Sequence, residues 1–218
     1  MTAVLFDLDG TLLDTARDMA AAMNALRAEA SLAPLPFESV RPFVSHGATA
    51  MVRLGFPEVP EAEFDVLRER FLTLYRGCLA EETQLFEGMP ELLGALELAE
   101  IPWGIVTNKP AWLTEPLLDA LQLRGRAGSL VCGDTFPERK PHPRPLLHAA
   151  AELAVAPELC LYIGDAERDI KAARAAQMRA LVARFGYIGP ADRIEEWLAD
   201  GCIDSPLQIL DWLKTASS

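Results

Sequence analysis

The stretch AVLFDLDGT, residues 3–11, joins a short apolar run to a segment that contains two acids and a glycine. An apolar run of this length that ends in a polar turn is typical of a buried β-strand. Side chains two residues apart in an extended chain point to the same side, so we expect Asp7 and Asp9 to lie together at the end of this strand.

Two neighbouring carboxylates repel each other unless a proton or a cation lies between them. Mg²⁺ prefers carboxylate oxygens, and it would relieve the repulsion between Asp7 and Asp9. Gly10 allows the backbone to approach a ligand closely, and its amide is expected to help to hold an anionic group such as a phosphate. Taken alone, the same stretch is equally consistent with an acidic turn that only closes a strand.

Short apolar runs recur along the chain, each followed by a turn and a segment of helical length. This order predicts an α/β fold, with a Rossmann-like parallel sheet covered by helices. Besides residues 3–6, the runs are residues 103–107, 129–133, 160–165 and 180–185.

Residues 15–85 interrupt the alternation with a long segment that contains no convincing strand. Residues 18–30 and 61–76 have helical composition and spacing, and Pro34 and Pro36 break the pattern between them. An insertion of this length is too long for a simple crossover. We therefore predict a catalytic core made of residues 1–14 and 86–218, with a helical cap over residues 15–85.

Composition excludes several classes of protein. The formal net charge is −12 and the pI is about 4.7, which disfavours nucleic acid and anionic membrane surfaces as partners. We see no secretion signal and no apolar stretch long enough to span a bilayer. Four widely spaced cysteines without a Cys-x-x-Cys pair predict reduced thiols. These observations together favour a cytoplasmic location.

Three further polar sites each follow a predicted strand, at the carboxyl end where open parallel sheets bind ligands. Thr107 and Asn108 follow the second run, and a hydroxyl there is suited to hydrogen-bond a phosphoryl group. Lys140 lies in the loop after the third run, where an ammonium group would neutralise negative charge. Asp165 and Asp169 follow the fourth run and face the same way, one helical turn apart.

Each of these sites also has an ordinary interpretation. Thr107 and Asn108 are common turn and helix-capping residues, and a lysine in a loop is usually solvated. Acids such as Asp165 and Asp169 are favoured at helix N-termini by the helix dipole. Four such sites in order, each at a strand end, are hard to explain as coincidence.

The segments DLDGT, TN, the lysine at 140 and GDAERD resemble the four motifs of the haloacid dehalogenase superfamily. The resemblance spans Asp7 to Met178 and is strongest to the phosphoglycolate phosphatase group, whose helical cap is inserted after the first motif. One departure is Gln177, where many relatives carry glycine. The resemblance implies an Mg²⁺-dependent phosphatase that acts on a small phosphorylated metabolite.

The resemblance also implies roles for individual residues. Asp7 would be the nucleophile that forms an aspartyl phosphate, and Asp9 would be the general acid and base. Thr107 and Lys140, together with Gly10 and Asn108, would hold the phosphoryl oxygens.

Magnesium would be bound by Asp7, Asp9 and Asp165, with Asp9 using its backbone carbonyl. Asp169 would support this set from nearby. A monomer and a homodimer are both compatible with the sequence.

Other reactions of the same superfamily are less consistent with these residues. Dehalogenase members lack the acid at the position of Asp9, and phosphonate-cleaving members use a cap lysine, whereas residues 15–85 contain no lysine. A sugar phosphomutase and a catalytically silent binding protein remain alternatives.

The substrate is the least determined property. The cap stretch RPFVSHGATAM, residues 41–51, resembles phosphoglycolate phosphatases and also a branch that acts on N-acetylmuramic acid 6-phosphate. Both substrates carry a carboxylate, so we predict that His46 and at least one of Arg41 and Arg53 bind it. A solvated loop histidine and solvated helix arginines are the ordinary interpretation.

Overall fold

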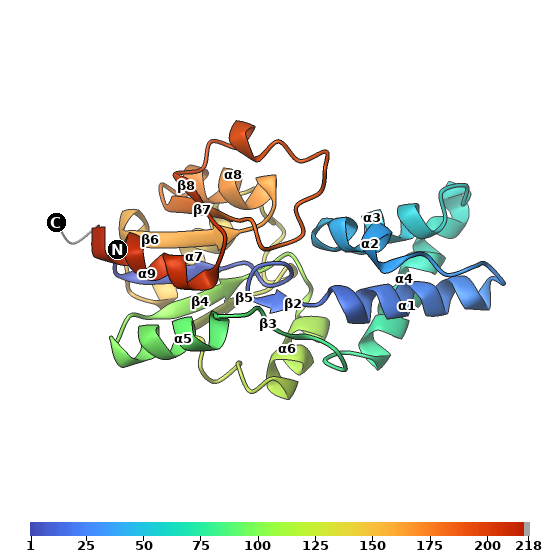
Figure 1. Cartoon of the computed structure of the whole chain (residues 1–218), viewed down its shortest axis with the longest axis horizontal. Helices are drawn as coiled ribbons and strands as arrows, with labels where there is room; N and C mark the ends of the chain where they lie inside the picture. Colours follow the sequence, from blue (N-terminus) through green and yellow to red (C-terminus); the bar gives the residue numbers. More distant parts are fainter. Residues whose placement is uncertain (216–218) are drawn as a thin grey trace.

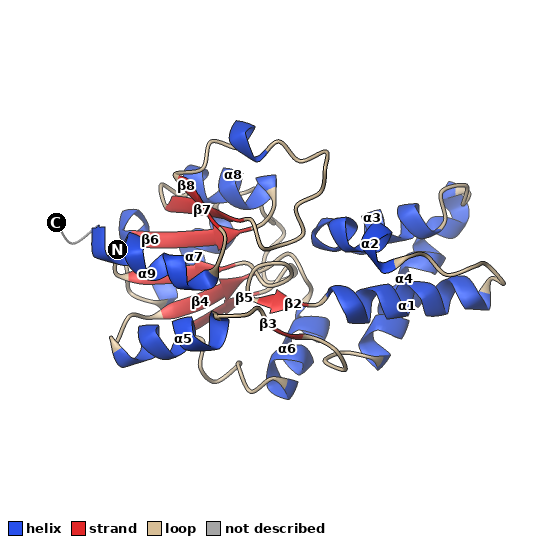
Figure 2. Cartoon of the chain, viewed as in Figure 1, coloured by secondary structure: helices blue, strands red, loops and turns tan. Residues whose placement is uncertain are grey.

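A parallel β-sheet forms the centre of the molecule (Figures 1 and 2). The computed structural model describes residues 1–215, and within this range six strands pair in the order β5-β4-β1-β6-β7-β8, all parallel. The strands of this sheet are β1 (Ala3–Phe6), β4 (Trp103–Val106), β5 (Ser129–Val131), β6 (Cys160–Gly164), β7 (Arg179–Ala183) and β8 (Gly201–Ile203).

Helices cover both faces of the sheet, which is why its central strands are apolar throughout rather than alternating. Val4 and Phe6 of β1 pack with α5 (Met89–Leu98), α6 (Ala111–Ala120) and α9 (Ile209–Thr215) on one face. Ala3 and Leu5 pack with α7 (Arg144–Glu152) and α8 (Glu167–Ala175) on the other face. Short 3-10 helices complete the core at Pro157–Leu159, Ile194–Glu196 and Pro206–Gln208.

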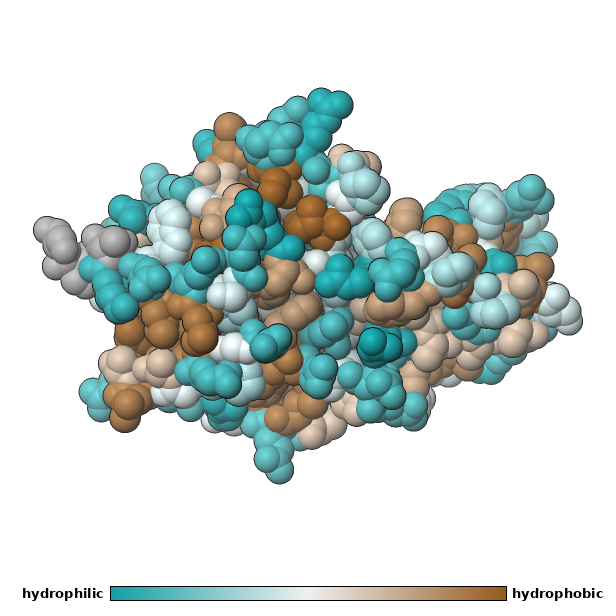
Figure 3. Space-filling model, in the orientation of Figure 1, coloured by the Kyte–Doolittle hydropathy of each residue, from teal (hydrophilic) through white to brown (hydrophobic). Residues whose placement is uncertain are grey.

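A separate helical lobe, which we call the cap, lies beyond one end of the sheet (Figure 1). It has its own apolar centre, in which Met23, Met51 and Phe71 are fully buried. The cap elements are α1 (Ala16–Glu29), α2 (Phe37–Val40), the 3-10 helix η1 (Arg41–His46), α3 (Gly47–Gly55) and α4 (Glu61–Gly77). A notch in the molecular outline marks where the cap meets the core (Figure 3).

The chain passes between core and cap twice, and the two crossings are paired. β2 (Leu13–Asp14) and β3 (Gln84–Leu85) form an antiparallel pair. Asp18, at the start of α1, accepts hydrogen bonds from the amides of Glu82 and Thr83 at 2.9 and 3.0 Å and from the Thr83 hydroxyl at 2.6 Å. These contacts tie the outgoing and returning segments together.

Most of the predicted architecture is confirmed. Each predicted strand is present to within two residues, and the helices expected at 18–30 and 61–76 are α1 and α4. The pairing of β2 with β3 supports the predicted cap boundaries at residues 15 and 85, which stay a prediction. The very short β2 and β3, and β8 at the sheet edge, were not predicted.

Two further sequence predictions concern membrane spans and thiols. None of the helices in residues 1–215 combines the length and apolar character that crossing a bilayer requires. Cys78, Cys132, Cys160 and Cys202 are all free thiols, as predicted.

Candidate active site

The polar side chains predicted from the sequence converge at the carboxyl ends of adjacent strands. Asp7 follows β1, Thr107 follows β4 and Asp165 follows β6, and these three strands are neighbours in the sheet. A cavity of about 410 Å³ lies above Asp7 and Thr107 and is bounded on the other side by the cap, and Asp165 lines a neighbouring cavity that shares His46 and Arg168 with it. Asp7, Asp9 and Thr107 line it from the core, and Arg68 and Tyr75 of α4 line it from the cap.

Lys140 holds Asp7 in place from beneath the cavity. Its side chain is completely buried, and its Nζ lies 2.8 Å from Asp7 Oδ1, 2.7 Å from Asp169 Oδ1 and 2.8 Å from Tyr162 Oη. An ammonium group has three N–H donors, so these contacts account for all of them. Lys140 therefore fixes the orientation of Asp7, and Asp169 fixes Lys140.

Asp7, Asp165 and Asp169 form a buried acidic cluster whose oxygens lie within 4.8 Å of one another. Burial, followed by the neighbouring carboxylates, raises the pKa of Asp165 to about 7. Burial and then Asp169 raise the pKa of Asp7 to about 6, although Lys140 opposes this shift.

The environment of Asp165 fits a bound cation. Its Oδ1 is buried and has no hydrogen-bond partner within residues 1–215. An orphaned, buried carboxylate oxygen beside a second carboxylate is the donor set that a hard divalent cation such as Mg²⁺ takes. Both oxygens of Asp169 have partners, since Oδ1 pairs with Lys140 and Oδ2 accepts a hydrogen bond from the Ala166 amide at 3.1 Å. The partners of Asp7 are all on Oδ1, so Asp7 and Asp165 are the carboxylates of the cluster that each offer an oxygen to an ion.

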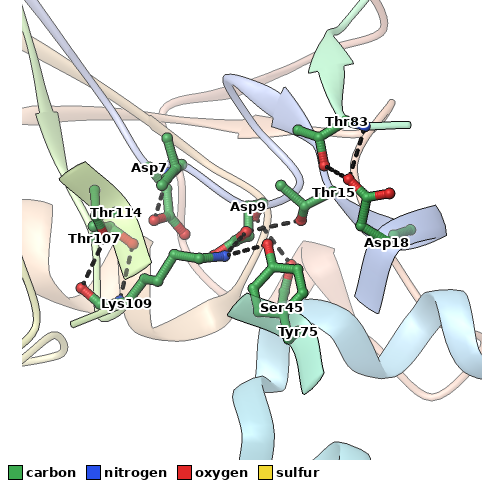
Figure 4. A network of polar contacts seen from close by, with 12 residues as sticks. Asp7, Asp9, Thr15, Asp18, Ser45, Tyr75, Thr83, Thr107, Lys109 and Thr114 are labelled. Atoms are coloured by element: carbon green, nitrogen blue, oxygen red, sulfur yellow. Dashed lines mark hydrogen bonds and ion pairs between the residues drawn. The ribbon is translucent and has the colours of Figure 1, made fainter. Parts of the chain in front are cut away.

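Asp9 differs from the prediction in the direction of its side chain. Its carboxylate lies outside the acidic cluster and accepts hydrogen bonds from Thr15 Oγ1 and Lys109 Nζ, both at 2.7 Å (Figure 4). Its backbone carbonyl, by contrast, lies 3.3 Å from Ser45 Oγ, whose single O–H donates to Asp165 Oδ2 at 2.6 Å. Only the Asp9 carbonyl is therefore positioned toward the acidic cluster.

Gly10 contributes space instead of a donor. Its φ of +83° favours glycine, and a Cβ at this position would lie 2.1 Å from Asp165 Oδ2. Its amide donates to the Leu13 carbonyl at 3.0 Å. The prediction that this amide holds a phosphoryl oxygen is not supported, because the turn itself uses the donor.

Thr107 and Asn108 have different tasks. The Thr107 hydroxyl oxygen accepts a hydrogen bond from the Lys109 amide at 3.1 Å, which leaves its O–H free to donate into the cavity. The Asn108 side chain instead donates to the Lys140 carbonyl at 3.0 Å and accepts from the Lys140 amide at 3.1 Å. Asn108 thus fixes the lysine loop, a role that the sequence alone did not indicate.

This geometry agrees with the comparisons to known proteins. A family model described as haloacid dehalogenase-like hydrolase matches residues 4–183. The chain belongs to this family.

Curated haloacid dehalogenase-like relatives match almost the whole chain. A phosphoglycolate phosphatase of Xanthomonas campestris is 46% identical over 208 residues, which are 95% of this chain and 94% of the relative. An N-acetylmuramic acid 6-phosphate phosphatase of Pseudomonas aeruginosa is 42% identical over 217 residues, covering 99% and 96%. A crystal structure described as a predicted phosphoglycolate phosphatase from Haemophilus somnus has a TM-score of 0.85, 26% identity and 97% coverage of both chains.

The cap residues predicted to bind a carboxylate do not all reach the cavity of this haloacid dehalogenase-like site. His46 lines it, but Arg41 and Arg53 do not. Arg53 pairs with Glu61 at 2.6 Å and lies over the ring of Phe64. Arg41 donates to the Phe185 carbonyl at 3.2 Å, so it joins cap to core instead of facing a ligand.

Several residues that line or shape the site were not singled out as site residues from the sequence. Arg68, Leu72 and Tyr75 recur at i, i+4 and i+7 on α4, within the segment 61–76 that was predicted only to be a helix. Lys109 follows the TN motif directly, which was an available signal. The missed residues are Ser45, Arg68, Tyr75, Lys109, Arg139 and Arg168.

Proposed function

We propose that this protein is an Mg²⁺-dependent phosphomonoesterase that transfers a phosphoryl group first to Asp7 and then to water. One observation carries the proposal: two acids with different environments line one cavity. Lys140 fixes Asp7 from below, whereas one carboxylate oxygen of Asp9 has no hydrogen-bond partner among residues 1–215. The phosphatase names of relatives at 42–46% identity support the same reaction class.

In the first step an oxygen of Asp7 attacks phosphorus, and the bond between phosphorus and the ester oxygen breaks. Asp7 Oδ1 accepts hydrogen bonds from the Leu8 amide at 2.7 Å and from Lys140 at 2.8 Å, which orients the carboxylate toward the cavity. Protonated Asp9 gives its proton to the departing alcohol. The products are the free alcohol and a phosphoryl group bonded to Asp7.

In the second step Asp9, now ionised, takes a proton from water. The resulting hydroxide attacks phosphorus, the bond to Asp7 breaks, and inorganic phosphate leaves. The Thr107 hydroxyl is free to donate to a phosphoryl oxygen in both steps.

Asp7, Asp165 and the Asp9 carbonyl are the groups that would hold Mg²⁺. The ion would supply positive charge beside the phosphoryl oxygens. Lys140, paired with Asp169, keeps Asp7 from turning away when its charge changes.

Release of inorganic phosphate from an aryl phosphate tests the reaction. We expect release that depends on added Mg²⁺ and stops in chelator. A mutase would return its phosphoryl group to a sugar and release little phosphate, and a silent binding protein would release none. Either result would contradict the proposal.

We propose that the substrate is a small phosphoester with a carboxylate in its leaving group. The named activities of the relatives, on phosphoglycolate and on N-acetylmuramic acid 6-phosphate, both satisfy this description. The cavity of about 410 Å³ falls in the range that holds drug-sized ligands, which is more than a two-carbon phosphoester fills. This observation favours N-acetylmuramic acid 6-phosphate as a second candidate beside phosphoglycolate.

The cap arginine that faces the cavity is Arg68, whose side chain is 40% exposed and whose nearest acid is Asp65 at 3.2 Å. We propose that Arg68 and His46 bind the substrate carboxylate. Arg68→Ala should lower kcat/KM for the better of the two substrates about 10-fold or more and leave an aryl phosphate unaffected. Arg53→Ala is the matched control, and an equal loss in both variants would contradict the assignment.

A further inference from the structure

The buried ammonium group of Lys109 connects Asp9, the proposed general acid, to the cap. The Lys109 side chain is 5% exposed, and its Nζ lies 2.7 Å from Asp9 Oδ1 and 2.9 Å from Tyr75 Oη (Figure 4). We infer that Lys109 is a positioning residue for Asp9, and that Tyr75 makes this positioning depend on the docked cap. The inference rests on the proposed phosphatase function.

The backbone of Lys109 is fixed by the core. Its amide donates to Thr107 Oγ1 at 3.1 Å, and its carbonyl accepts from the Gly133 amide at 2.8 Å and the Thr114 hydroxyl at 3.3 Å. The ammonium group therefore projects from an anchored point toward Asp9. A side chain held in this way can orient a partner without itself moving.

The two oxygens of Asp9 have different roles: Oδ1 accepts the hydrogen bonds that orient the carboxylate, and Oδ2 is available for proton transfer. Oδ1 receives hydrogen bonds from both Lys109 and Thr15, whereas Oδ2 has no hydrogen-bond partner within residues 1–215. The terminal torsion of an aspartate is otherwise broad, so two donors on one oxygen narrow it. Oδ2 is thus left to carry the proton, and Lys109 determines where it points.

Tyr75 brings the cap into this arrangement. It belongs to α4, is 1% exposed and stacks against Phe71 with ring centroids 6.5 Å apart. Burial is the main cause that raises the pKa of Tyr75 well above its usual value, so the phenol stays neutral and its oxygen can accept from Lys109. The ammonium also lies 4.6 Å from the centre of the Tyr75 ring.

A displaced cap would therefore remove one of the two acceptors of Lys109 and the aromatic face beside it. The Lys109 ammonium could then move together with the Asp9 carboxylate, and it would no longer fix the orientation of that carboxylate. The alignment of Asp9 for proton transfer is therefore weakened when α4 is not docked over the cavity, because Thr15 is then the remaining fixed donor to Oδ1. This links substrate enclosure to the acid that the leaving group needs.

The test compares leaving groups in Lys109→Met and Tyr75→Phe. The measured quantity is kcat/KM for an alkyl phosphate, whose leaving group needs a proton, and for an aryl phosphate, whose leaving group does not. We expect Lys109→Met to lose about 10²-fold on the alkyl phosphate and less than about 5-fold on the aryl phosphate. Tyr75→Phe, which keeps the ring, should show the same pattern with a loss of about 3- to 10-fold.

Asp9→Asn is the reference, and Lys214→Met, which removes an exposed and remote ammonium, is the control. The double variant Asp9→Asn/Lys109→Met should lose no more on the alkyl phosphate than Asp9→Asn alone. If Asp9→Asn itself shows no dependence on the leaving group, the proposed function fails.

If Asp9→Asn shows that dependence but Lys109→Met and Tyr75→Phe lose equally on both substrates, Lys109 binds the phosphoryl group or only stabilises the fold. That result would overturn the inference. Should Lys109→Met not fold, Tyr75→Phe alone carries the same comparison.

Discussion

Asp7 and Asp9 are two residues apart, yet their surroundings give them different chemistry. Asp7 is buried, and its Oδ1 lies 2.8 Å from the Lys140 ammonium. The Asp9 side chain is 16% exposed at the cavity wall, and its Oδ2, which has no hydrogen-bond partner in the described part of the chain, is available to exchange a proton. A nucleophile needs the first environment, and a general acid needs the second.

Replacing Asp7 tests the nucleophile. Asp7→Asn keeps the side-chain shape but removes the attacking oxygen, so we expect kcat to fall by at least about 10³-fold with unchanged far-ultraviolet circular dichroism. The melting temperature should stay the same or rise, because a buried carboxylate with a raised pKa is replaced by a neutral group. Turnover within about 10-fold of the unmodified protein would contradict the assignment.

Replacing Asp9 should separate the two steps of the reaction. With an aryl phosphate, Asp9→Asn still allows phosphoryl transfer to Asp7, but no base remains to activate water. We expect a rapid release of phenolate, stoichiometric with enzyme, followed by turnover about 10²- to 10⁴-fold slower. Rapid-mixing absorbance measurements follow the burst, and a linear progress curve without one would argue against this role.

Sequence alone could predict the residues whose position follows from a strand end. Asp7, Thr107 and Asp165 were found because the carboxyl ends of neighbouring parallel strands meet at one edge. The direction of the Asp9 side chain depends on Lys109 and Tyr75, which are far apart in sequence. Such contacts are set by tertiary packing, which residue spacing does not describe.

The same limit applies to the cap. Its helices were predicted from composition, but which of its arginines faces the core depends on how α3 and α4 pack. Arg53 turned to Glu61, while Arg68 faces the cavity.

At the level of single elements, α8 is followed by a non-glycine residue with left-handed backbone conformation. The Met178 amide donates to the Ala173 carbonyl at 2.9 Å and the Gln177 amide donates to the Arg174 carbonyl at 3.0 Å, which is the Schellman pattern of helix ends. Gln177 has a φ of +60°, a conformation that favours glycine.

Gln177→Gly should therefore stabilise the protein. Relief of the left-handed strain is expected to raise the free energy of unfolding by about 0.5–1 kcal/mol, measured by urea denaturation. Ala175→Gly, at an exposed position with helical backbone two residues earlier, is the control and should lower it by a similar amount. Destabilisation by both substitutions would mean that the Gln177 side chain contributes more than its backbone costs.

At the level of the whole molecule, the acidic cluster should couple stability to pH and to metal. The pKa values of Asp7 and Asp165 are raised to about 6 and about 7, so the folded state favours their protonated forms. The two raised pKa values therefore add to the free energy of unfolding. This addition is fully present below about pH 4 and is lost as the pH rises through 6 and 7. In chelator, the melting temperature of the unmodified protein should therefore fall more between pH 5 and pH 8 than that of Asp165→Asn, whose residue 165 cannot ionise.

Saturating Mg²⁺ should reverse the order of the two proteins. At pH 8 without metal, Asp165→Asn should melt higher than the unmodified protein; with Mg²⁺ the unmodified protein should melt higher, because the ion binds the ionised carboxylates. Thermal denaturation at both pH values, with and without metal, checks this. Parallel curves in all conditions would show that Asp165 binds no ion.

The paired crossings β2 and β3 have a consequence for how such proteins diversify. Leu13 lies opposite Leu85 and Asp14 opposite Gln84, and residues paired in this way have Cα atoms about 4.5–5.5 Å apart, the spacing at the base of a β-hairpin. The entire cap is therefore inserted like the loop of one β-hairpin. The pairing of β2 with β3 is the same whatever the length of the segment between them. A lineage can therefore exchange this lobe for another while the strand ends that carry Asp7, Thr107 and Asp165 stay in place, provided that the new lobe again supplies an acceptor for Lys109. Substrate preference can then change with the cap while the nucleophile is kept.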